Sequence, residues 1–409
     1  MPSITRRTLL GTLAVGAAAG IAGCSSSCPD SDPPEPSVVV DGTAGSGFET
    51  LPGGSWPQPR FDAGNTGHAP VRPPTDSPTL RWRTTLSAPP VDGTDAAASS
   101  PTVADGRVYV TTAEGAFALS LRDGSERWHH ETTPATTGPT VGYDDELAPP
   151  VVADGRVYLA TADGVVALHA DDGTVAWRAT DAAATGVPAV HGDGLLAPTT
   201  DGLAELDARD GSRRWVADVE ATLPAVADGT VVAGGEETVA LDAASGDREW
   251  SASARAEFHP VVADDTVFLG TYSQLVGLAL DDGRERWAVD RGGGRTFSAP
   301  VVTPETVYTV ERPSEAADAT FAFDRDGDGS PEPRWCSYVG EGSVTAAAGG
   351  HAFALQSGAA DPQLVAFTER FGEATWGYAA ADRTVPPAVL DGGVVTVTRR
   401  GTVAAVGGA

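Results

Sequence analysis

The chain of 409 residues is 41% hydrophobic and 7% aromatic, which supplies enough apolar side chain for a sizeable core and excludes global disorder. It carries 56 acidic and 27 basic residues, a formal net charge of −29, and every basic residue is arginine. A dense carboxylate surface is typical of halophilic proteins, because molar salt screens its self-repulsion. The alternative is an acidic surface that recruits a cationic partner. The composition argues against nucleic acid, since phosphate binding needs clustered basic residues.

The N-terminus has the features of an export signal. Arg6 and Arg7 precede an apolar, Gly/Ala-rich stretch that ends at Ile21, which indicates the twin-arginine route. The stretch is too short and too rich in glycine to span a membrane. It ends in Ile-Ala-Gly-Cys24, which resembles the lipobox of lipoproteins, where cleavage precedes a cysteine whose sulfur is alkylated by a diacylglyceryl lipid. We therefore predict a signal peptide over residues 1–23 and a lipid anchor on the outer face of the cytoplasmic membrane, which is the protein's only membrane contact.

Residues 24–54 are rich in Ser, Pro, Asp and Gly, and this composition predicts a flexible linker between anchor and folded domain. Cys28 lies in this linker and Cys336 lies far along the chain. A Cys28–Cys336 disulfide is compatible with an oxidising compartment. Because a bond between a spacer and the folded domain has no evident purpose, we expect two free thiols.

A repeat dominates the rest of the chain. Residues 150–158 recur in weakened form, and copies begin at Pro101, Pro188, Pro224, Pro260, Pro300 and Pro387. Alternating apolar residues follow each proline. Glycines such as Gly155, Gly164 and Gly173 can adopt the positive φ that a tight hairpin turn requires. Three turns join four strands, so each copy predicts one four-stranded antiparallel sheet.

Eight tryptophans recur at intervals of 35 to 49 residues, the span expected of a propeller blade. Six of them follow a glycine by four residues. A tryptophan buries on the order of 200 Å² and its indole N–H needs an acceptor, so it is suited to docking one blade on the next. The predicted docking residues are Trp82, Trp128, Trp177, Trp215, Trp250, Trp287, Trp335 and Trp376.

The two ends of the repeat region complement each other. Residues 80–82 have the pattern of an outer strand without inner strands, and residues 387–406 have that of inner strands without an outer one. Pairing them would close a ring and remove exposed sheet edges. The sequence therefore predicts an all-β fold over residues 55–409, an eight-bladed β-propeller closed by its N- and C-terminal strands, which we expect to be monomeric.

The repeat resembles the pyrroloquinoline-quinone (PQQ) repeat family, whose docking motif has Ala, Asp, Thr-Gly and Trp at fixed positions. Residues 240–250, with Ala240, Asp242, Gly246 and Trp250, are the nearest match, and residues 56–67 resemble the family's opening segment. The resemblance covers about residues 56–406. It implies the propeller fold and two branches of function.

One branch comprises quinoprotein dehydrogenases, which hold PQQ and Ca²⁺ in the axial funnel above an adjacent-cysteine disulfide. The other comprises scaffolds such as the outer-membrane assembly lipoprotein BamB. The three cysteines here include no adjacent pair, and no Cys-x-x-Cys-His haem motif occurs. We therefore expect a non-catalytic scaffold that binds a protein or peptide at the cell surface, with no catalytic residues and no PQQ. A dehydrogenase that uses PQQ and calcium is the alternative.

An acidic turn is the one candidate metal site. Asp324, Asp326 and Asp328 alternate as in a Ca²⁺-binding loop, and a glycine fills the sixth position. The twelfth position is Trp335, where such a loop has a bidentate Glu. The same residues also fit a solvated turn between two strands.

Overall fold

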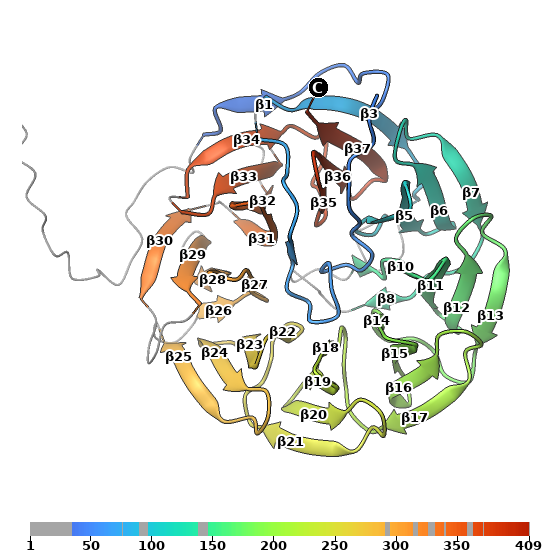
Figure 1. Ribbon diagram of the computed structural model, residues 1–409, viewed down its shortest axis with the longest axis vertical. Helices are drawn as coiled ribbons and strands as arrows, with labels where there is room; N and C mark the ends of the chain where they lie inside the picture. The colour runs from blue at the N-terminus through green and yellow to red at the C-terminus, as the bar shows by residue number, and fades with distance from the viewer. Residues whose placement is uncertain are drawn as a thin grey trace, which may run out of the picture.

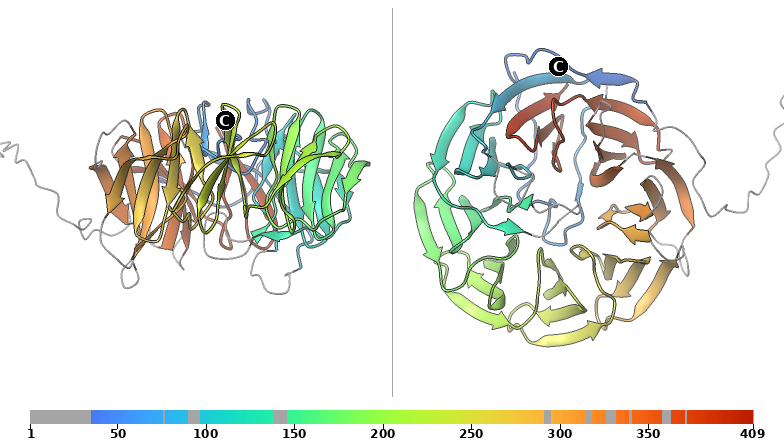
Figure 2. Two further views of the ribbon diagram at one scale, coloured as in Figure 1. Left: turned by 90° about the horizontal axis from the view of Figure 1, so that it is seen from below. Right: turned by 180° about the vertical axis from the view of Figure 1, so that it is seen from behind.

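The computed structural model describes residues 35–75, 77–89, 97–137, 146–290, 295–313, 318–325, 332–338, 341–357, 363–370 and 372–408. Eight sheets are arranged around one axis as a closed ring (Figure 1), which is a flat disc when seen from the side (Figure 2). The predicted all-β, eight-bladed propeller is confirmed. Over these residues, no helix is long and apolar enough to cross a bilayer.

The blades follow chain order, each from an inner strand at the axis to an outer strand at the rim. Blade 1 is β4 (Thr102–Ala104), β5 (Arg107–Thr112), β6 (Gly115–Ser120) and β7 (Glu126–His130). The short pair β8 (Thr136–Thr137) and β9 (Glu146–Leu147) leads to blade 2, which is β10 (Val151–Ala153), β11 (Arg156–Thr161), β12 (Gly164–His169) and β13 (Val175–Ala179). Blade 3 is β14 (Ala189–His191), β15 (Gly194–Thr199), β16 (Gly202–Asp207) and β17 (Arg213–Ala217). Blade 4 is β18 (Ala225–Ala227), β19 (Thr230–Gly234), β20 (Thr238–Asp242) and β21 (Arg248–Ala252).

The later blades have the same plan with additions. Blade 5 is β22 (Val261–Ala263), β23 (Thr266–Gly270), β24 (Gln274–Ala279) and β25 (Glu285–Asp290). In blade 6, β26 (Arg295–Phe297) and β27 (Val301–Val302) both pair with β28 (Thr306–Pro313), followed by β29 (Ala319–Asp324) and β30 (Pro333–Tyr338). Blade 7 is β31 (Glu341–Ala348), β32 (His351–Ser357), β33 (Leu364–Thr368) and β34 (Ala374–Tyr378), with β2 (His68–Ala69) parallel to its inner strand.

The hairpin turns explain the spacing of the glycines. Asp154 and Gly155 have φ of 47° and 70°, the left-handed pair of a two-residue turn that joins β10 to β11. Next along the chain, β11 and β12 pair with Tyr158 opposite Ala167. A β-bulge after Ala167 shifts the register beside Trp177. Such a bulge interrupts the regular pairing and changes the direction of one side chain. It recurs beside the outer-strand tryptophans of blades 1 to 7.

The core consists of apolar layers between neighbouring blades. Tyr158 and Trp177 of blade 2, for example, belong to one buried cluster with Leu195 and Leu206 of blade 3. Each such side chain contributes about 1.5–3 kcal/mol on burial. Each boundary between blades therefore stabilises both of its sheets.

The eighth blade is composite, as predicted. It consists of β35 (Ala388–Leu390), β36 (Gly393–Val397) and β37 (Thr402–Gly407) from the end of the chain, completed by β3 (Thr79–Thr85). In the pairing of β3 with β37, Leu80 lies opposite Val406 and Trp82 opposite Ala405. The two ends of the propeller domain thus close the ring in one sheet.

The predicted flexible linker is wrong for residues 38–54; residues 24–34 lie outside the described chain. β1 (Val38–Val40) adds to blade 7 as a parallel strand on the rim side of β34. Beyond it, the Phe48 N–H donates to the carbonyl of Arg122 at 2.8 Å, and the Phe48 ring is buried. The Ser- and Gly-rich composition concealed Val38, Val40 and Phe48, whose side chains pack on the rim, whereas Val39 is 45% exposed.

The expectation of a free thiol is wrong for Cys336. This residue lies on β30 and is disulfide-bonded, and its partner lies outside the described residues. The composition of residues 24–54 predicted a flexible spacer, and a disulfide between a spacer and the folded domain had no evident structural role.

Candidate functional site

The predicted docking tryptophans lie on the outer strands, at the boundaries between blades. Trp128 of β7 donates its indole N–H to the carbonyl of Ala170 in blade 2 at 2.9 Å. The same bond, over 2.7–3.1 Å, joins Trp82 to Leu121, Trp177 to Ala208, Trp215 to Ala243, Trp250 to Leu280, Trp335 to Glu369 and Trp376 to Pro74. Trp287 packs against Phe268 of its own blade, with ring centroids 5.9 Å apart, and belongs to a buried cluster with Phe321 and Phe323 of blade 6. The eight tryptophans therefore pack neighbouring blades together.

An N-terminal segment, residues 53–69, runs through the centre of the ring (Figure 1). It receives one N–H donor from every blade over 2.6–2.9 Å, in blades 1 to 7 from the inner strand and in blade 8 from the turn that follows β35. These bonds join Val103 to the carbonyl of Trp56, Val152 to Pro57, Val226 to Ala63, Val262 to Gly64, Val302 to Thr66, Ala347 to Gly67 and Asp391 to Gly53, and join Val190 to Oε1 of Gln58. One segment therefore links all eight blades at the axis.

Two buried polar side chains of this axial segment bind further carbonyl groups. Asn65, 2% exposed, donates through Nδ2 to the carbonyls of Pro224 and Pro260 at 3.1 and 3.2 Å. Arg60, 1% exposed, donates to the carbonyls of Pro300 and Thr345. Desolvation lowers the pKa of Arg60 to about 10. The recurring prolines thus begin the inner strands and present carbonyl groups to the axis.

The two buried polar side chains of the axial segment are engaged by the protein's own backbone. Arg60 and Asn65, which could have met a carboxylated quinone, use their donors on backbone carbonyls. Within the described ranges, no group of three or more His, Cys, Asp or Glu side chains could hold a metal ion. The sequence also lacks the adjacent cysteines of the dehydrogenase branch.

The acidic turn is only partly described. Asp324 lies at the end of β29, and its carboxylate accepts a hydrogen bond from the guanidinium of Arg334. Asp326 and Asp328 lie outside the described residues, so calcium binding stays a prediction. The export and lipidation residues Arg6, Arg7 and Cys24 also lie outside them.

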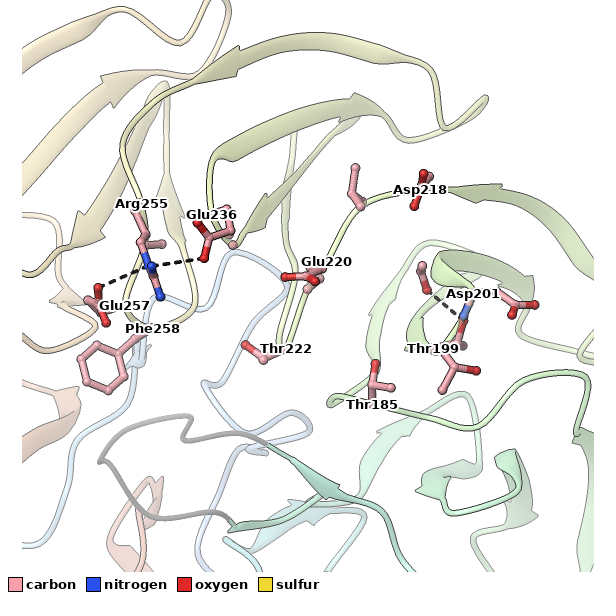
Figure 3. A pocket seen from close by; sticks show the side chains of 17 residues that line it. Thr185, Thr199, Asp201, Asp218, Glu220, Thr222, Glu236, Arg255, Glu257 and Phe258 are labelled. Carbon is pink, nitrogen blue, oxygen red and sulfur yellow. Dashed lines mark hydrogen bonds and ion pairs between the residues drawn. The ribbon is translucent and has the colours of Figure 1, made fainter.

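A cleft opens on one face of the ring, over blades 3 and 4 (Figure 3). It has a volume of about 560 Å³. Its walls are the turn at residues 199–202, the connection at 218–222, the turn at 234–236 and the connection at 255–258. Backbone bonds anchor two of these walls to neighbouring segments of the propeller: Val187 N–H donates to the carbonyl of Thr222 at 2.7 Å, and Glu257 N–H donates to that of Gly270 at 3.1 Å. The cleft is therefore formed in advance of any ligand.

Carboxylates dominate the cleft. Its one arginine, Arg255, lies between Glu236 and Glu257, with N–O distances of 3.1 and 3.5 Å. Asp218 and Glu220 on the opposite wall are exposed and form no ion pair with any described residue. The cleft thus offers two uncompensated negative charges to a cationic group. Sequence reasoning missed it because its residues come from turns of different blades that share no motif.

A second hollow of about 410 Å³ lies beside the axial segment at blades 4 to 6. Asp62 faces it and accepts bonds from the N–H and hydroxyl of Thr66 at 2.9 and 2.6 Å. Burial raises the pKa of Asp62 and lowers that of His68, which also lines the hollow. Both effects disfavour charge here, so this hollow is a weaker candidate for binding an ion.

The fold and the axial segment define the class of protein: an eight-bladed propeller of PQQ-like repeats with tryptophan docking. The sequence profile described as outer membrane protein assembly factor BamB matches residues 75–288 and 203–328, and the chain belongs to this family of PQQ-like repeat propellers. Among curated proteins, none matches the sequence.

Several solved structures share the fold. BamB from Moraxella catarrhalis has 17% identity and a TM-score of 0.58, covering 80% of this chain and 100% of its own. Quinohemoprotein alcohol dehydrogenase ADHIIG from Pseudomonas putida HK5 has 14% identity and a TM-score of 0.64, with coverage of 87% and 80%. A europium-containing methanol dehydrogenase has 13% identity and a TM-score of 0.62, with coverage of 84% and 88%. At these identities the likeness establishes the fold and leaves both branches of function open.

Proposed function

We propose that this protein is a non-catalytic scaffold of the cell surface, a lipoprotein that binds a cationic segment of another protein or peptide in the cleft over blades 3 and 4. The observation that carries the proposal is the cleft itself, which combines a preformed wall with the free carboxylates of Asp218 and Glu220. An extended chain with an Arg or Lys side chain complements such a site in shape and charge.

The rest of the molecule is built for rigidity, which supports a scaffold. Every blade is bonded to the axial segment and to its neighbours, so the cleft walls are held by a frame that loses little entropy on binding. The BamB-type family profile supports a role in protein binding. The twin-arginine sequence and Cys24 support export and anchoring on the outer face of the cytoplasmic membrane.

The test is crosslinking in molar salt, on cells that produce the full-length protein, followed by identification of what is bound. The wild type should capture a stoichiometric partner. The double variant Asp218→Asn, Glu220→Gln should capture at least tenfold less of that partner. The control Glu126→Gln, Asp247→Asn removes the same charge from exposed sites outside the cleft and should leave capture unchanged. Equal capture by both double variants would show that the cleft is not the binding site.

The dehydrogenase alternative predicts turnover of an alcohol, whereas the scaffold proposal predicts none. The test is reconstitution of the purified protein with PQQ and Ca²⁺, followed by a dye-reduction assay over a panel of alcohols. We expect no turnover above a heat-denatured control. Steady turnover would overturn the scaffold proposal.

A further inference from the structure

Cys336 is the one cysteine among the described residues. It lies opposite Phe321 on the outer two strands of blade 6 and is partly buried against the apolar cluster between blades 5 and 6. Its sulfur is disulfide-bonded. The other two cysteines, Cys24 and Cys28, both precede the first described residue. Within one chain, the partner is one of these two.

We propose that the partner is Cys28 and that the bond clamps the lipidated end of the chain to the rim of the propeller. The inference rests on the lipid anchor of the proposed function, because a Cys24 sulfur that is alkylated as a thioether has no thiol left to oxidise. Formation of the bond removes one proton from each thiol. The two electrons reduce a disulfide of the thiol oxidoreductase class to two thiols.

The described N-terminal residues place the tail within reach of Cys336. Ser37 donates its hydroxyl to the carbonyl of Thr375 on β34, and Val38 pairs with Trp376. The strand of Cys336 is docked on the same blade, because its neighbour Trp335 donates to the carbonyl of Glu369. β30 and β34 are thus neighbouring strands on the rim (Figure 1). The nine residues from Cys28 to Ser37 can extend over about 30 Å, which is enough to cross one outer strand.

The bond would shorten the chain that connects the lipid to the propeller. With it, four residues separate the lipid from the clamp, a reach of about 13 Å, whereas an unclamped tail would run about 46 Å to Val38. The rim of blades 6 and 7 is then held beside the bilayer. Blades 3 and 4, which carry the cleft, lie across the ring from blade 7 (Figure 1).

The experiment is release of the anchored protein by a protease. A cysteine-free cleavage sequence is inserted between Ser31 and Asp32 of the full-length protein, and isolated membranes are treated with a salt-tolerant, site-specific protease. The wild type should remain with the membrane after cleavage, and a reductant should then increase the released fraction at least tenfold. Cys28→Ser and Cys336→Ser should be released by the protease alone, and the neighbouring control Ser27→Ala should behave as the wild type.

Release of the wild type without reductant overturns the clamp. Non-reducing peptide mapping separates the remaining outcomes. A Cys28–Cys336 peptide without lipid on Cys24 supports the bond and refutes the anchor. A Cys24–Cys336 peptide, or a bond between two chains, refutes the clamp. Because mapping requires no partner, failure of the binding proposal would be seen separately, in the crosslinking experiment.

Discussion

The indole ring of Trp128 lies against the backbone of Gly173 in the next blade, where a methyl group on the glycine would come within 2.7 Å of the ring. The same relationship joins Gly124 to Trp82, Gly211 to Trp177, Gly246 to Trp215, Gly283 to Trp250 and Gly372 to Trp335. In the sequence each glycine precedes its own tryptophan by four residues, but in space it receives the tryptophan of the preceding blade. We call each such glycine–tryptophan contact a joint. Each repeat therefore supplies the glycine of the joint with the preceding blade and the tryptophan of the joint with the following blade.

Gly173→Ala should destabilise the protein more than Gly155→Ala. The two glycines have φ of +71° and +70°, so alanine costs about 1 kcal/mol of backbone strain at either position. Nothing lies within 4 Å of the methyl position at Gly155, whereas at Gly173 the indole adds about 1–3 kcal/mol of overpacking. Denaturant unfolding at one salt concentration measures the difference. Equal losses would mean that the indole does not need the space beside Gly173.

Asn65→Asp should lower the free energy of unfolding by about 3 kcal/mol, because a carboxylate cannot donate to the carbonyls of Pro224 and Pro260 and is buried beside them. Gln58→Glu is the matched control. Its side-chain oxygen accepts from Val190 N–H at 2.9 Å, a bond that a carboxylate keeps, so its cost should be less than about 1 kcal/mol. The reverse order would contradict the role of the axial segment described above.

Trp128→Phe should cost about 1 kcal/mol more than Trp177→Phe. Each change removes an indole donor, but the carbonyl of Ala208 also accepts from the Tyr158 hydroxyl at 3.0 Å and stays satisfied. The carbonyl of Ala170 has the Trp128 indole as its side-chain donor. Adding Tyr158→Phe to the Trp177→Phe variant should remove the second donor to the Ala208 carbonyl, so the double variant should lose about 1 kcal/mol more than Trp177→Phe alone. Thermal and denaturant unfolding both measure this loss of stability.

Stability should fall as the pH is lowered from 8 to 5.5. Burial lowers the pKa of His68, His130 and His191, so the unfolded chain takes up protons first and the stabilisation is lost below about pH 6.5. The raised pKa of Asp62 has the opposite sign but acts only near and above pH 4. His191→Gln should flatten the dependence of Tm on pH, whereas the exposed control His169→Gln should not. Because desolvation causes the shifts, the effect should persist in molar salt.

The acidic turn should release heat when calcium is added to chelator-treated protein, and the Asp326→Asn, Asp328→Asn variant should give none. Arg334→Gln should strengthen binding, because it frees the carboxylate of Asp324 from its guanidinium partner. Absence of heat in the wild type would leave the turn as a solvated hairpin connection.

The repeat made most of the fold predictable. A feature present in every blade, such as the glycine and tryptophan of each joint, gives several copies of the same signal, and the incomplete copies at residues 80–82 and 387–406 imply closure. Features that occur once give no such signal. The bonds of Arg60 and Asn65 depend on carbonyl groups from four blades, and backbone groups leave no trace in a sequence.

The cleft was beyond prediction for a related reason. Asp218 and Glu220 are two carboxylates among 56 acidic residues, and only the fold shows that they share a cleft wall with no cation beside them. The disulfide of Cys336 was missed because the composition of residues 24–54 predicts a loose tether. In the structure, Val38 already belongs to blade 7.

The axial segment is synthesised before any of its hydrogen-bond donors, and its last donor, Asp391, follows it by more than 300 residues. Until β37 exists, β3 has no strand to pair with and the axial segment lacks its last donor, so the nascent chain is an open arc with an unpaired sheet edge. The finished ring can form only after the ribosome has released nearly the whole chain. A truncation that removes β37 would therefore leave β3 unpaired in an incomplete, aggregation-prone ring.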